Sequence, residues 1–348
     1  MADQAATPLG IATRKPFGLW RHLNKLRWLT LGAVMAMLIL IPYLHLYQTY
    51  RAAHAYDLLA ASEKQIYDAM EFVTAPFVDN PAEDLDAIKG NTWSGTFWGL
   101  KISDPLAVLG QSVAGWLIHW PFALTAMIPL IVTLLFGRVF CGWICPATFI
   151  YELNSSLAAW LRWAGINPTI LPAHWHFDRR LKYLVLAVGL VLSSISGASL
   201  VAGIYPPAII GRELYYAVAL GGFGVGSAIF FGTLLFDLLV ARRGFCRYIC
   251  PGGALYSLIG RYRLLRIRRI VETCNDCEKC TAVCEFELNP MRDNFGQECN
   301  NCTACIAICP TDALTFDIRP VDVPEQGPGH LGRNYRNNIP NLEKKYEG

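Results

Sequence analysis

Charged residues are scarce in this sequence. Only 16% of its 348 residues are Asp, Glu, Lys or Arg, whereas 53% are hydrophobic. An ordinary soluble domain carries about 25% charged residues, so the composition excludes a typical soluble protein and indicates an integral membrane protein. The net charge of +3 is small for this length, so nothing indicates binding to nucleic acid.

Histidine and methionine are also few, with seven and six residues, and they do not cluster as a copper route would need. No catalytic nucleophile is evident. The first apolar stretch lacks a small-residue cleavage site, so we expect a retained helix and not a signal peptide. Cysteine is abundant by contrast, and the 12 cysteines fall into tight metal-ligand spacings, which predicts reduced thiolates and not a disulfide framework.

Long apolar runs predict four membrane spans, because each is near the roughly 20 residues that cross a bilayer. Pro121 and Pro129 suggest a kink in the second. Lys and Arg collect before the first and third spans and after the fourth, which predicts that both termini face the cytoplasm. The four spans are residues 28–46, 106–137, 183–205 and 214–240.

Residues 274–310 carry two runs with the spacing C-x2-C-x2-C-x3-C, typical of bacterial two-cluster ferredoxins. In that pattern three cysteines hold one 4Fe-4S cluster and the fourth reaches the other. Two structural zinc sites are the alternative, but these usually draw on two cysteine pairs. We therefore assign Cys274, Cys277, Cys280 and Cys309 to one cluster, and Cys299, Cys302, Cys305 and Cys284 to the other.

A duplication links the two halves of the apolar region. Residues 138–146 (RVFCGWICP) match residues 243–251 (RGFCRYICP). This predicts two helical hairpins related by a pseudo-twofold axis along the membrane normal. The axis would bring together the four C-x3-C-P cysteines as a third redox centre or a redox-active thiol site, the alternatives being structural cysteines or a disulfide. These four are Cys141, Cys145, Cys246 and Cys250.

Two polar residues near the spans are tentative quinol or proton sites. His119 lies in the second predicted span and is either a quinol ligand or an interfacial histidine. Asp237, at the inner end of the fourth, is either a proton acceptor or a helix-end charge. The loop 47–105 is expected outside, as a docking surface for a redox partner or a solvated segment. Arginines between residues 261 and 269 either bind anionic lipid headgroups or only obey the charge rule.

Together these motifs resemble the NapH-type membrane ferredoxins and the related MauN group. The resemblance covers about residues 100–316 and includes Asp104-Pro105-Leu106, both C-x3-C-P motifs and both ferredoxin runs. It implies four spans in the bacterial inner membrane, cytoplasmic termini, and withdrawal of electrons from the quinol pool for a periplasmic or membrane-bound redox partner. The family's C-x3-C-P cysteines are thought to matter for electron transfer.

The predicted fold is an all-α bundle of four spans followed by a small α+β domain with two 4Fe-4S clusters. The predicted function is quinol-linked electron transfer. An assembly factor that supplies electrons or metal to a partner enzyme is the alternative, and flow toward quinone would use the same residues. The remaining boundaries are a basic N-terminus (1–27), an inner segment (138–182), a basic segment (241–269), the ferredoxin domain (270–318) and a C-terminal tail (319–348).

Overall fold

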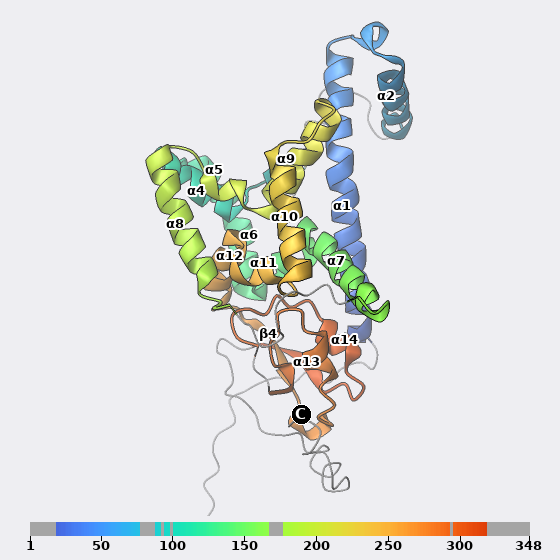
Figure 1. Ribbon diagram of the computed structural model, residues 1–348. Coiled ribbons are helices and arrows are strands. Elements are labelled where there is room, and N and C mark those ends of the chain that lie inside the picture. Colours follow the sequence, from blue (N-terminus) through green and yellow to red (C-terminus); the bar gives the residue numbers. More distant parts are fainter. Residues whose placement is uncertain are drawn as a thin grey trace, which may run out of the picture. The chain divides into compact units, whose positions relative to one another are not determined.

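The computed structural model describes residues 19–76, 88–91, 94–97, 100–166, 177–292 and 295–318, most of them in helices (Figure 1). The predicted tail at 319–348 and most of the predicted basic N-terminus lie outside these residues. The chain forms two compact units. The cysteine-rich unit comprises Met1–Leu29, Val132–Trp143 and Tyr256–Gly348, and the helical unit comprises Thr30–Ile131 and Ile144–Leu255.

The longest element is α1, Leu19–Ala52, with 34 residues. Its segment His22–Ala52 is the one helix in the described part of the chain that is long and apolar enough to cross a membrane, with a mean hydropathy of 2.0 in its best window. The first predicted span lies inside this helix. The helix continues beyond that span at both ends, so α1 also carries polar residues such as Arg27 and Arg51.

The second predicted span is divided into three helices and is not one kinked helix. The first, α4 (Pro105–Gly115), ends at Trp116, whose φ of 51° is left-handed. Pro121 then stands in the first turn of α5 (Trp120–Thr125), where its missing N–H is tolerated. The third, α6, covers Met127–Phe136.

The third and fourth predicted spans also differ from the helices that form. α8 covers Leu181–Ser196 and ends at Gly197, whose φ is 70°. The predicted start of the fourth span at Leu214 is wrong, because that residue lies inside α9, Pro206–Ala219. Gly221, with φ 64°, lies in the break before α10, Val225–Leu239. The glycine-rich segment 220–224 separates two helices that hydropathy alone merges.

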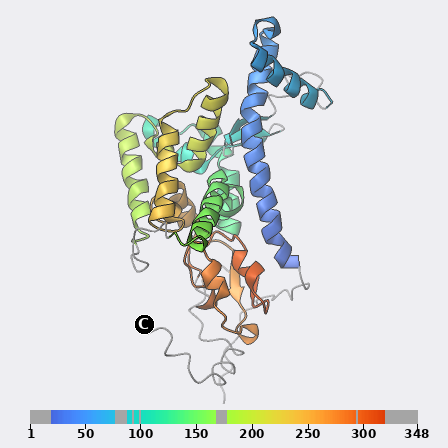
Figure 2. The same cartoon turned by 45° about the vertical axis from the view of Figure 1, so that its right-hand side comes forward.

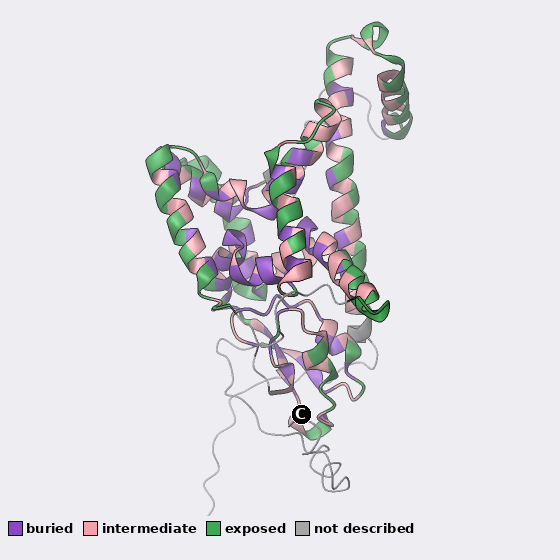
Figure 3. Ribbon diagram, viewed as in Figure 1, coloured by how far each residue is buried: buried purple, intermediate pink, exposed green. Residues whose placement is uncertain are grey.

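Three apolar stretches are thus shorter than α1: Trp120–Phe136, Leu181–Ser196 and Val225–Leu239. The 16 residues of α8 extend about 24 Å at 1.5 Å per residue, less than a bilayer core of about 30 Å. These helices nevertheless have exposed faces (Figure 3), and the exposed residues include large apolar side chains. Leu184 is 60% exposed and Ile195 78% exposed on α8, and Phe231 is 65% exposed on α10.

The loop predicted to lie outside contains helices and strands. A 3-10 turn, η1 (Tyr56–Leu58), leads into α2 (Ala61–Thr74), which lies alongside the end of α1 in both ribbon views (Figures 1 and 2). The sheet that follows is antiparallel with strand order β1-β2-β3. Its strands are β1 (Ile88–Asn91), β2 (Ser94–Phe97) and β3 (Leu100–Ile102).

The duplicated motifs form short helices at the ends of the apolar helices. The first begins in a π-helical turn, η3 (Phe140–Ile144), and continues as α7 (Pro146–Trp163). The second forms α11 (Gly244–Tyr248) and α12 (Pro251–Gly260). Pro146 and Pro251 each stand at the first position of a helix, where the fixed φ of proline suits the turn. A further 3-10 turn, η4, covers Leu200–Gly203.

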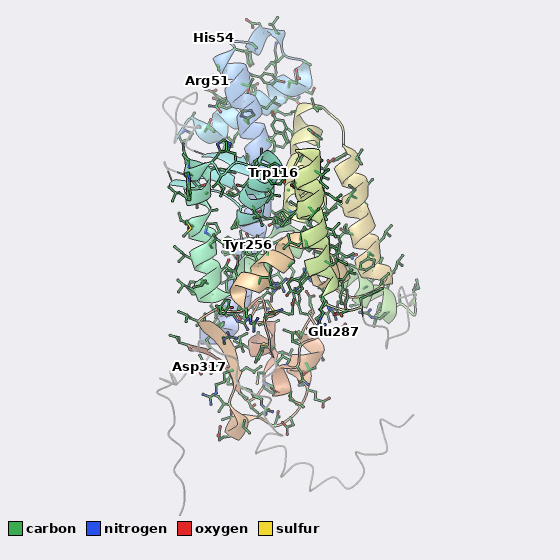
Figure 4. The ribbon with its side chains drawn as sticks, turned by 90° about the vertical axis from the view of Figure 1, so that its left-hand side faces the viewer. Arg51, His54, Trp116, Tyr256, Glu287 and Asp317 are labelled. Atoms are coloured by element: carbon green, nitrogen blue, oxygen red, sulfur yellow. The ribbon has the colours of Figure 1, made fainter. Side chains whose placement is uncertain are left out.

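The cysteine-rich unit has an antiparallel pair of strands, β4 (Leu265–Arg269) and β5 (Leu314–Ile318), in which Leu265 pairs with Ile318. Asp317 on β5 is labelled in Figure 4. Because β4 belongs to this sheet, the predicted domain start at residue 270 is five residues late. The short helices between the strands are η5 (Val271–Thr273), α13 (Lys279–Val283), η6 (Pro290–Arg292) and α14 (Ala304–Ile308).

Candidate iron-sulfur and thiol sites

The first predicted ligand set lines one cavity. Cys274, Cys277, Cys280 and Cys309 share its wall with Arg269. Burial raises the pKa of Cys280 to about 11, and the nearby thiols of Cys309 and Cys274 act in the same direction. Cys309 follows α14, on the other run from its three partners. The fold therefore brings the distant fourth cysteine to the triplet that the spacing predicts for it.

The second predicted ligand set is also gathered. Burial raises the pKa of Cys302 to about 11, and the thiols of Cys299 and Cys284 add to the rise. Burial likewise raises the pKa of Cys305 well above its ordinary value, and Cys302, Cys299 and Cys284 again contribute. Cys284 lies at the end of α13, so this set too draws its fourth thiol from the opposite run.

The two thiol sets have equivalent loops but different charges. Asp276 stands 3.5 Å from the Cys274 sulfur through Oδ1, and Asn301 stands at the same distance from the Cys299 sulfur. Arg269 lies beside the first set, with Nη1 3.9 Å from the Cys274 sulfur and 3.5 Å from Asp276. An acidic residue thus accompanies the first set and a neutral amide the second.

These sets fit a pair of 4Fe-4S clusters. All eight thiols are free of disulfides, and most are buried or half-buried. Among the described residues no three His, Cys, Asp or Glu side chains converge as ligands of a single metal ion. Thiolates that each bind a different iron of a cubane do not need to converge on one point. The sequence assignment of four ligands to each cluster therefore has a matching arrangement in the fold.

The first C-x3-C-P motif contacts the second ferredoxin run within the cysteine-rich unit. Arg27 Nε donates to the Gly142 carbonyl over 2.7 Å. Trp143 Nε1 donates to the Asn301 carbonyl over 3.0 Å. At Gly142 a Cβ atom would lie 2.6 Å from the Asn300 carbonyl oxygen, so the two backbones touch where a side chain has no room. Cys141 lies in this contact segment.

The other three C-x3-C-P cysteines lie in the helical unit. Cys246 is on α11, and burial raises its pKa well above the ordinary value, with further contributions from Cys250 and Cys145. The Cys250 sulfur accepts from the Gly253 N–H over 3.3 Å. Cys145, Cys246 and Cys250 therefore form one thiol group. Cys141 lies on the π-helical turn η3, and Cys145 directly follows that turn as the N-cap of α7.

Each C-x3-C-P motif also carries a buried arginine that the sequence analysis missed. Arg138 is 1% exposed and pairs with Glu298 at 2.7 Å in the cysteine-rich unit. Arg243 is 2% exposed and pairs with Glu152 at 2.9 Å in the helical unit. The repeat could have indicated these two arginines, because both copies have an arginine three residues before the first cysteine, in an apolar part of the sequence.

The repeat extends further than the predicted match. Tyr151 and Tyr256 both follow the proline by five residues, and each is 1% exposed. The Arg243 guanidinium lies over the Tyr151 ring at 5.9 Å, and Phe140 stacks with Tyr256 at 5.8 Å. The beginning of each motif therefore contacts the end of the other copy, a reciprocal pattern that a pseudo-twofold relation produces.

The two tentative quinol residues have different environments. His119 is exposed in the break before α5 and is not within a helix, so its predicted position inside a continuous span is wrong. Exposed apolar residues surround it in sequence, including Trp116 and Trp120 at 81% and 69%. Asp237 is buried, and its Oδ1 accepts from the Phe245 N–H over 2.8 Å, next to Cys246.

Three arginines of the basic run before the ferredoxin cysteines are buried. Arg263, Arg266 and Arg269 are 0%, 5% and 1% exposed. Arg263 donates to the Gly296 carbonyl over 2.7 Å, and Arg266 donates to the Arg261 carbonyl over 2.8 Å. The predicted lipid contact is therefore wrong for these three, which satisfy carbonyl groups or lie beside the thiols of the unit.

Comparisons with known proteins agree with these motifs. A family model described as a 4Fe-4S binding domain matches residues 118–163 and 223–271. Each matched segment contains one C-x3-C-P motif, and neither reaches the ferredoxin runs. The ferredoxin-type protein NapH of Haemophilus influenzae is 36% identical over 220 residues, which cover 61% of this chain and 70% of that protein.

The chain belongs to the NapH and MauN family of ferredoxin-type proteins. The methylamine utilization ferredoxin-type protein MauN of Paracoccus denitrificans is 32% identical over 213 residues, covering 60% of this chain and 71% of the relative. The regulatory protein NosR of Pseudomonas aeruginosa is 32% identical over 205 residues but only 25% of it is covered. No solved structure matches. Membership in the NapH and MauN family supports an iron-sulfur electron-transfer role.

Proposed function

We propose that this protein is a membrane subunit that passes electrons from the quinol pool through 4Fe-4S clusters to a periplasmic or membrane-bound reductase partner. One observation carries the proposal. Two groups of four thiols, each drawn from both cysteine runs, are gathered in the cysteine-rich unit of a chain whose other unit exposes apolar helix faces. Eight thiols so arranged serve electron transfer, and the apolar faces suit a bilayer.

The membrane arrangement in this proposal has four spans in the bacterial inner membrane with both termini cytoplasmic. Its support is α1 together with the three shorter apolar stretches, and the arginines near their ends, which favour a cytoplasmic location. Short helices reach across a bilayer when flanking half-helices or local thinning make up the length. Here α4 and α9 are the flanking half-helices, and each begins with proline.

The C-x3-C-P cysteines are proposed to hold a third iron-sulfur centre. Its ligands would be Cys141, Cys145, Cys246 and Cys250. The support is the mutual proximity of three of these thiols, the repeat that generates the pairs, and the two matches of a model described as a 4Fe-4S binding domain. The alternative is that the same four cysteines form a redox-active thiol site without a cluster.

When bound, such clusters supply one-electron redox chemistry. The residues of the chain do the rest. Eight thiolates would hold the clusters, and the burial of Cys305 would limit the access of water to one of them. Oxidation of one quinol to quinone releases two electrons and two protons, so the electrons leave as two single transfers and the protons need an acceptor. His119 stays the proposed quinol contact, because it is exposed among apolar side chains.

Anaerobic purification of the full chain, followed by iron and acid-labile sulfide analysis, tests the cluster content. Quinol-driven bleaching of the visible absorbance then tests the donor. We expect bleaching with a reduced quinone analogue and full bleaching with dithionite. Bleaching by dithionite alone would contradict the quinol role. Transient rather than stoichiometric association with a partner reductase would favour the alternative, an assembly factor that supplies electrons or metal.

A further inference from the structure

The two thiol sets of the cysteine-rich unit do not have the same neighbours. The second run, Cys299 to Cys305, is contacted by segments from far along the chain. Arg138 binds Glu298, directly before Cys299. Trp143 binds the carbonyl of Asn301, directly before Cys302. The first set instead lies among its own loop and the strands, with Arg269 of β4 against Cys274.

We infer that Arg27, the segment Arg138–Trp143 and the loop Glu298–Cys302 form a junction, through which the thiol set Cys284, Cys299, Cys302 and Cys305 exchanges electrons with the segment that carries Cys141. The set Cys274, Cys277, Cys280 and Cys309 is then the distal one. Within the junction Arg27 raises the reduction potential of the proximal site. This inference rests on the proposed electron-transfer function and adds to it the order of the two sites and the residue that tunes one of them.

The backbone around Gly142 contacts the loop between Cys299 and Cys302. Gly142 directly follows Cys141, and its Cα approaches the Asn300 carbonyl so closely that a Cβ would lie 2.6 Å from it. Asn301, in the same loop, makes a second contact with this chain segment, because its side-chain amide nitrogen donates to the Phe136 carbonyl over 2.8 Å. The loop between Cys299 and Cys302 is thus fastened on both sides to the chain that carries Cys141.

Arg27 brings a buried positive charge to the junction. Arg27 is 3% exposed and is fixed by its hydrogen bond to Gly142. Its guanidinium is thus held at the residue whose backbone touches the loop between Cys299 and Cys302. A fixed positive charge favours the reduced, more negative form of a cluster. Arg138 adds little net charge, because Glu298 neutralises it.

The distal set also has an arginine beside it. Arg269 lies 3.5 Å from Asp276, and the two charges largely cancel. At the corresponding loop position the proximal set has Asn301, which is neutral. Arg27 therefore raises the reduction potential of the proximal site, and Arg269 raises that of the distal site.

The test is a redox titration of the purified full-length protein with dithionite, followed by electron paramagnetic resonance. Cys302→Ser and Cys277→Ser identify which signal belongs to which set. Arg27→Gln is expected to lower the midpoint potential of the Cys302-dependent signal and leave the Cys277-dependent signal unchanged. Arg269→Gln is expected to lower the midpoint potential of the Cys277-dependent signal and leave the Cys302-dependent signal unchanged. Arg27→Lys, which keeps the charge, should stay near the wild-type midpoint.

A second variant tests the contact without changing a charge. Gly142→Ala forces the Asn300 carbonyl away, so it should broaden or shift the Cys302-dependent signal only. Gly32→Ala is the matched control, because a Cβ there meets nothing within 4 Å. The junction is overturned if Arg27→Gln or Gly142→Ala shifts both signals equally, or shifts only the Cys277-dependent one. These titrations use dithionite, so an absence of reduction by quinol would contradict the proposed donor and leave the junction standing.

Discussion

A guanidinium nitrogen of Arg138 lies 2.7 Å from a carboxylate oxygen of Glu298, with the two side chains 1% and 9% exposed. The same arginine lies over the ring of Phe286 at 5.3 Å. Two residues separated by 160 positions are therefore held as a buried ion pair, and Glu298 stands directly before Cys299 in the sequence. Removing one partner of such a pair leaves an uncompensated charge in the interior, whereas replacing both with apolar residues removes the penalty.

Loss of Arg138 alone should therefore destabilise the cysteine-rich unit. Arg138→Met is expected to lower its free energy of unfolding by about 3–5 kcal/mol, because the buried carboxylate of Glu298 loses its ion-pair partner. The double variant Arg138→Met, Glu298→Leu should recover most of that loss. The measurement is loss of the iron-sulfur absorbance against denaturant concentration.

An exposed ion pair provides the control for this measurement. Arg51 and Glu71 are 37% and 39% exposed, and pairs of that kind contribute about 0–1 kcal/mol. Arg51→Met should therefore leave the absorbance transition unchanged. If Arg138→Met were equally harmless, the buried pair would have no role in holding the cluster loop.

The equivalent arginine of the second motif should act on the other unit. Arg243 pairs with Glu152 over 2.9 Å, and both side chains are almost fully buried. Arg243→Met is expected to destabilise the helical unit by a similar amount, about 3–5 kcal/mol. The two signals of the ferredoxin cysteines should persist. Thermal aggregation in detergent reports the first effect and paramagnetic resonance the second.

The neighbouring Arg242 gives a matched control, since it is exposed. Arg242→Met removes the same charge one residue away and should leave thermal aggregation near the wild-type temperature. Equal effects from Arg242→Met and Arg243→Met would show that net charge, and not the buried pair, determines the stability of this unit.

Metal-ligand spacing is a property of a few adjacent residues, so the sequence alone predicts which thiols would share a cluster, and that ligation stays a prediction. The two sets of thiols come together with their fourth members exchanged, as the two-cluster pattern predicts. The repeat predicted that Cys141, Cys145, Cys246 and Cys250 come together, and the thiols of Cys145, Cys246 and Cys250 do lie near one another.

Features that depend on distant partners were not predictable in the same way. Hydropathy averages over a window, so it could not detect the break at Gly221 between α9 and α10. Nothing local shows that Arg263 and Arg269 point inward, because a basic run beside a span looks the same whether it faces lipid or a carbonyl group. The partners of Arg138 and Arg243 are set by tertiary packing, although their repetition marked them as unusual.

Asp237 should act as an acceptor for the backbone and not as a proton acceptor for quinol. Its Oδ1 accepts the Phe245 N–H over 2.8 Å, and Phe245 precedes Cys246. Asp237→Ala removes the acceptor and leaves that buried N–H without it, so stability should fall by about 1–3 kcal/mol. Asp237→Asn keeps an oxygen acceptor at the same place and should lose much less.

Electron transfer separates the two roles of Asp237. If the carboxylate only holds the turn, Asp237→Asn should keep most of the wild-type rate of quinol-driven bleaching. If it takes a proton from quinol, the same variant should be as slow as Asp237→Ala, because an amide cannot accept the proton. Comparing the two rates at equal cluster content decides between them.

The contact between α1 and α2 should depend on pH through Glu71. Arg51 donates to both carboxylate oxygens of Glu71, and Tyr47 also donates to it. These hydrogen bonds, that of Arg51 first, lower the pKa of Glu71 below its ordinary value of 4.5. Because the folded pKa is depressed, the stabilisation is complete above the ordinary value and is lost as pH falls through the folded one.

Amide hydrogen exchange in α2 measures this effect. The pair is more than one-third exposed, so solvent screening limits its contribution to about 0.5 kcal/mol, roughly a twofold change in the opening equilibrium. Protection of α2 should be constant from pH 8 to about 5 and should fall at lower pH. In Glu71→Gln the protection should be lower at neutral pH and should no longer fall with acid. If Glu71→Gln still lost protection in acid, another carboxylate on α2 would be responsible, because this substitution removes only the titration of Glu71.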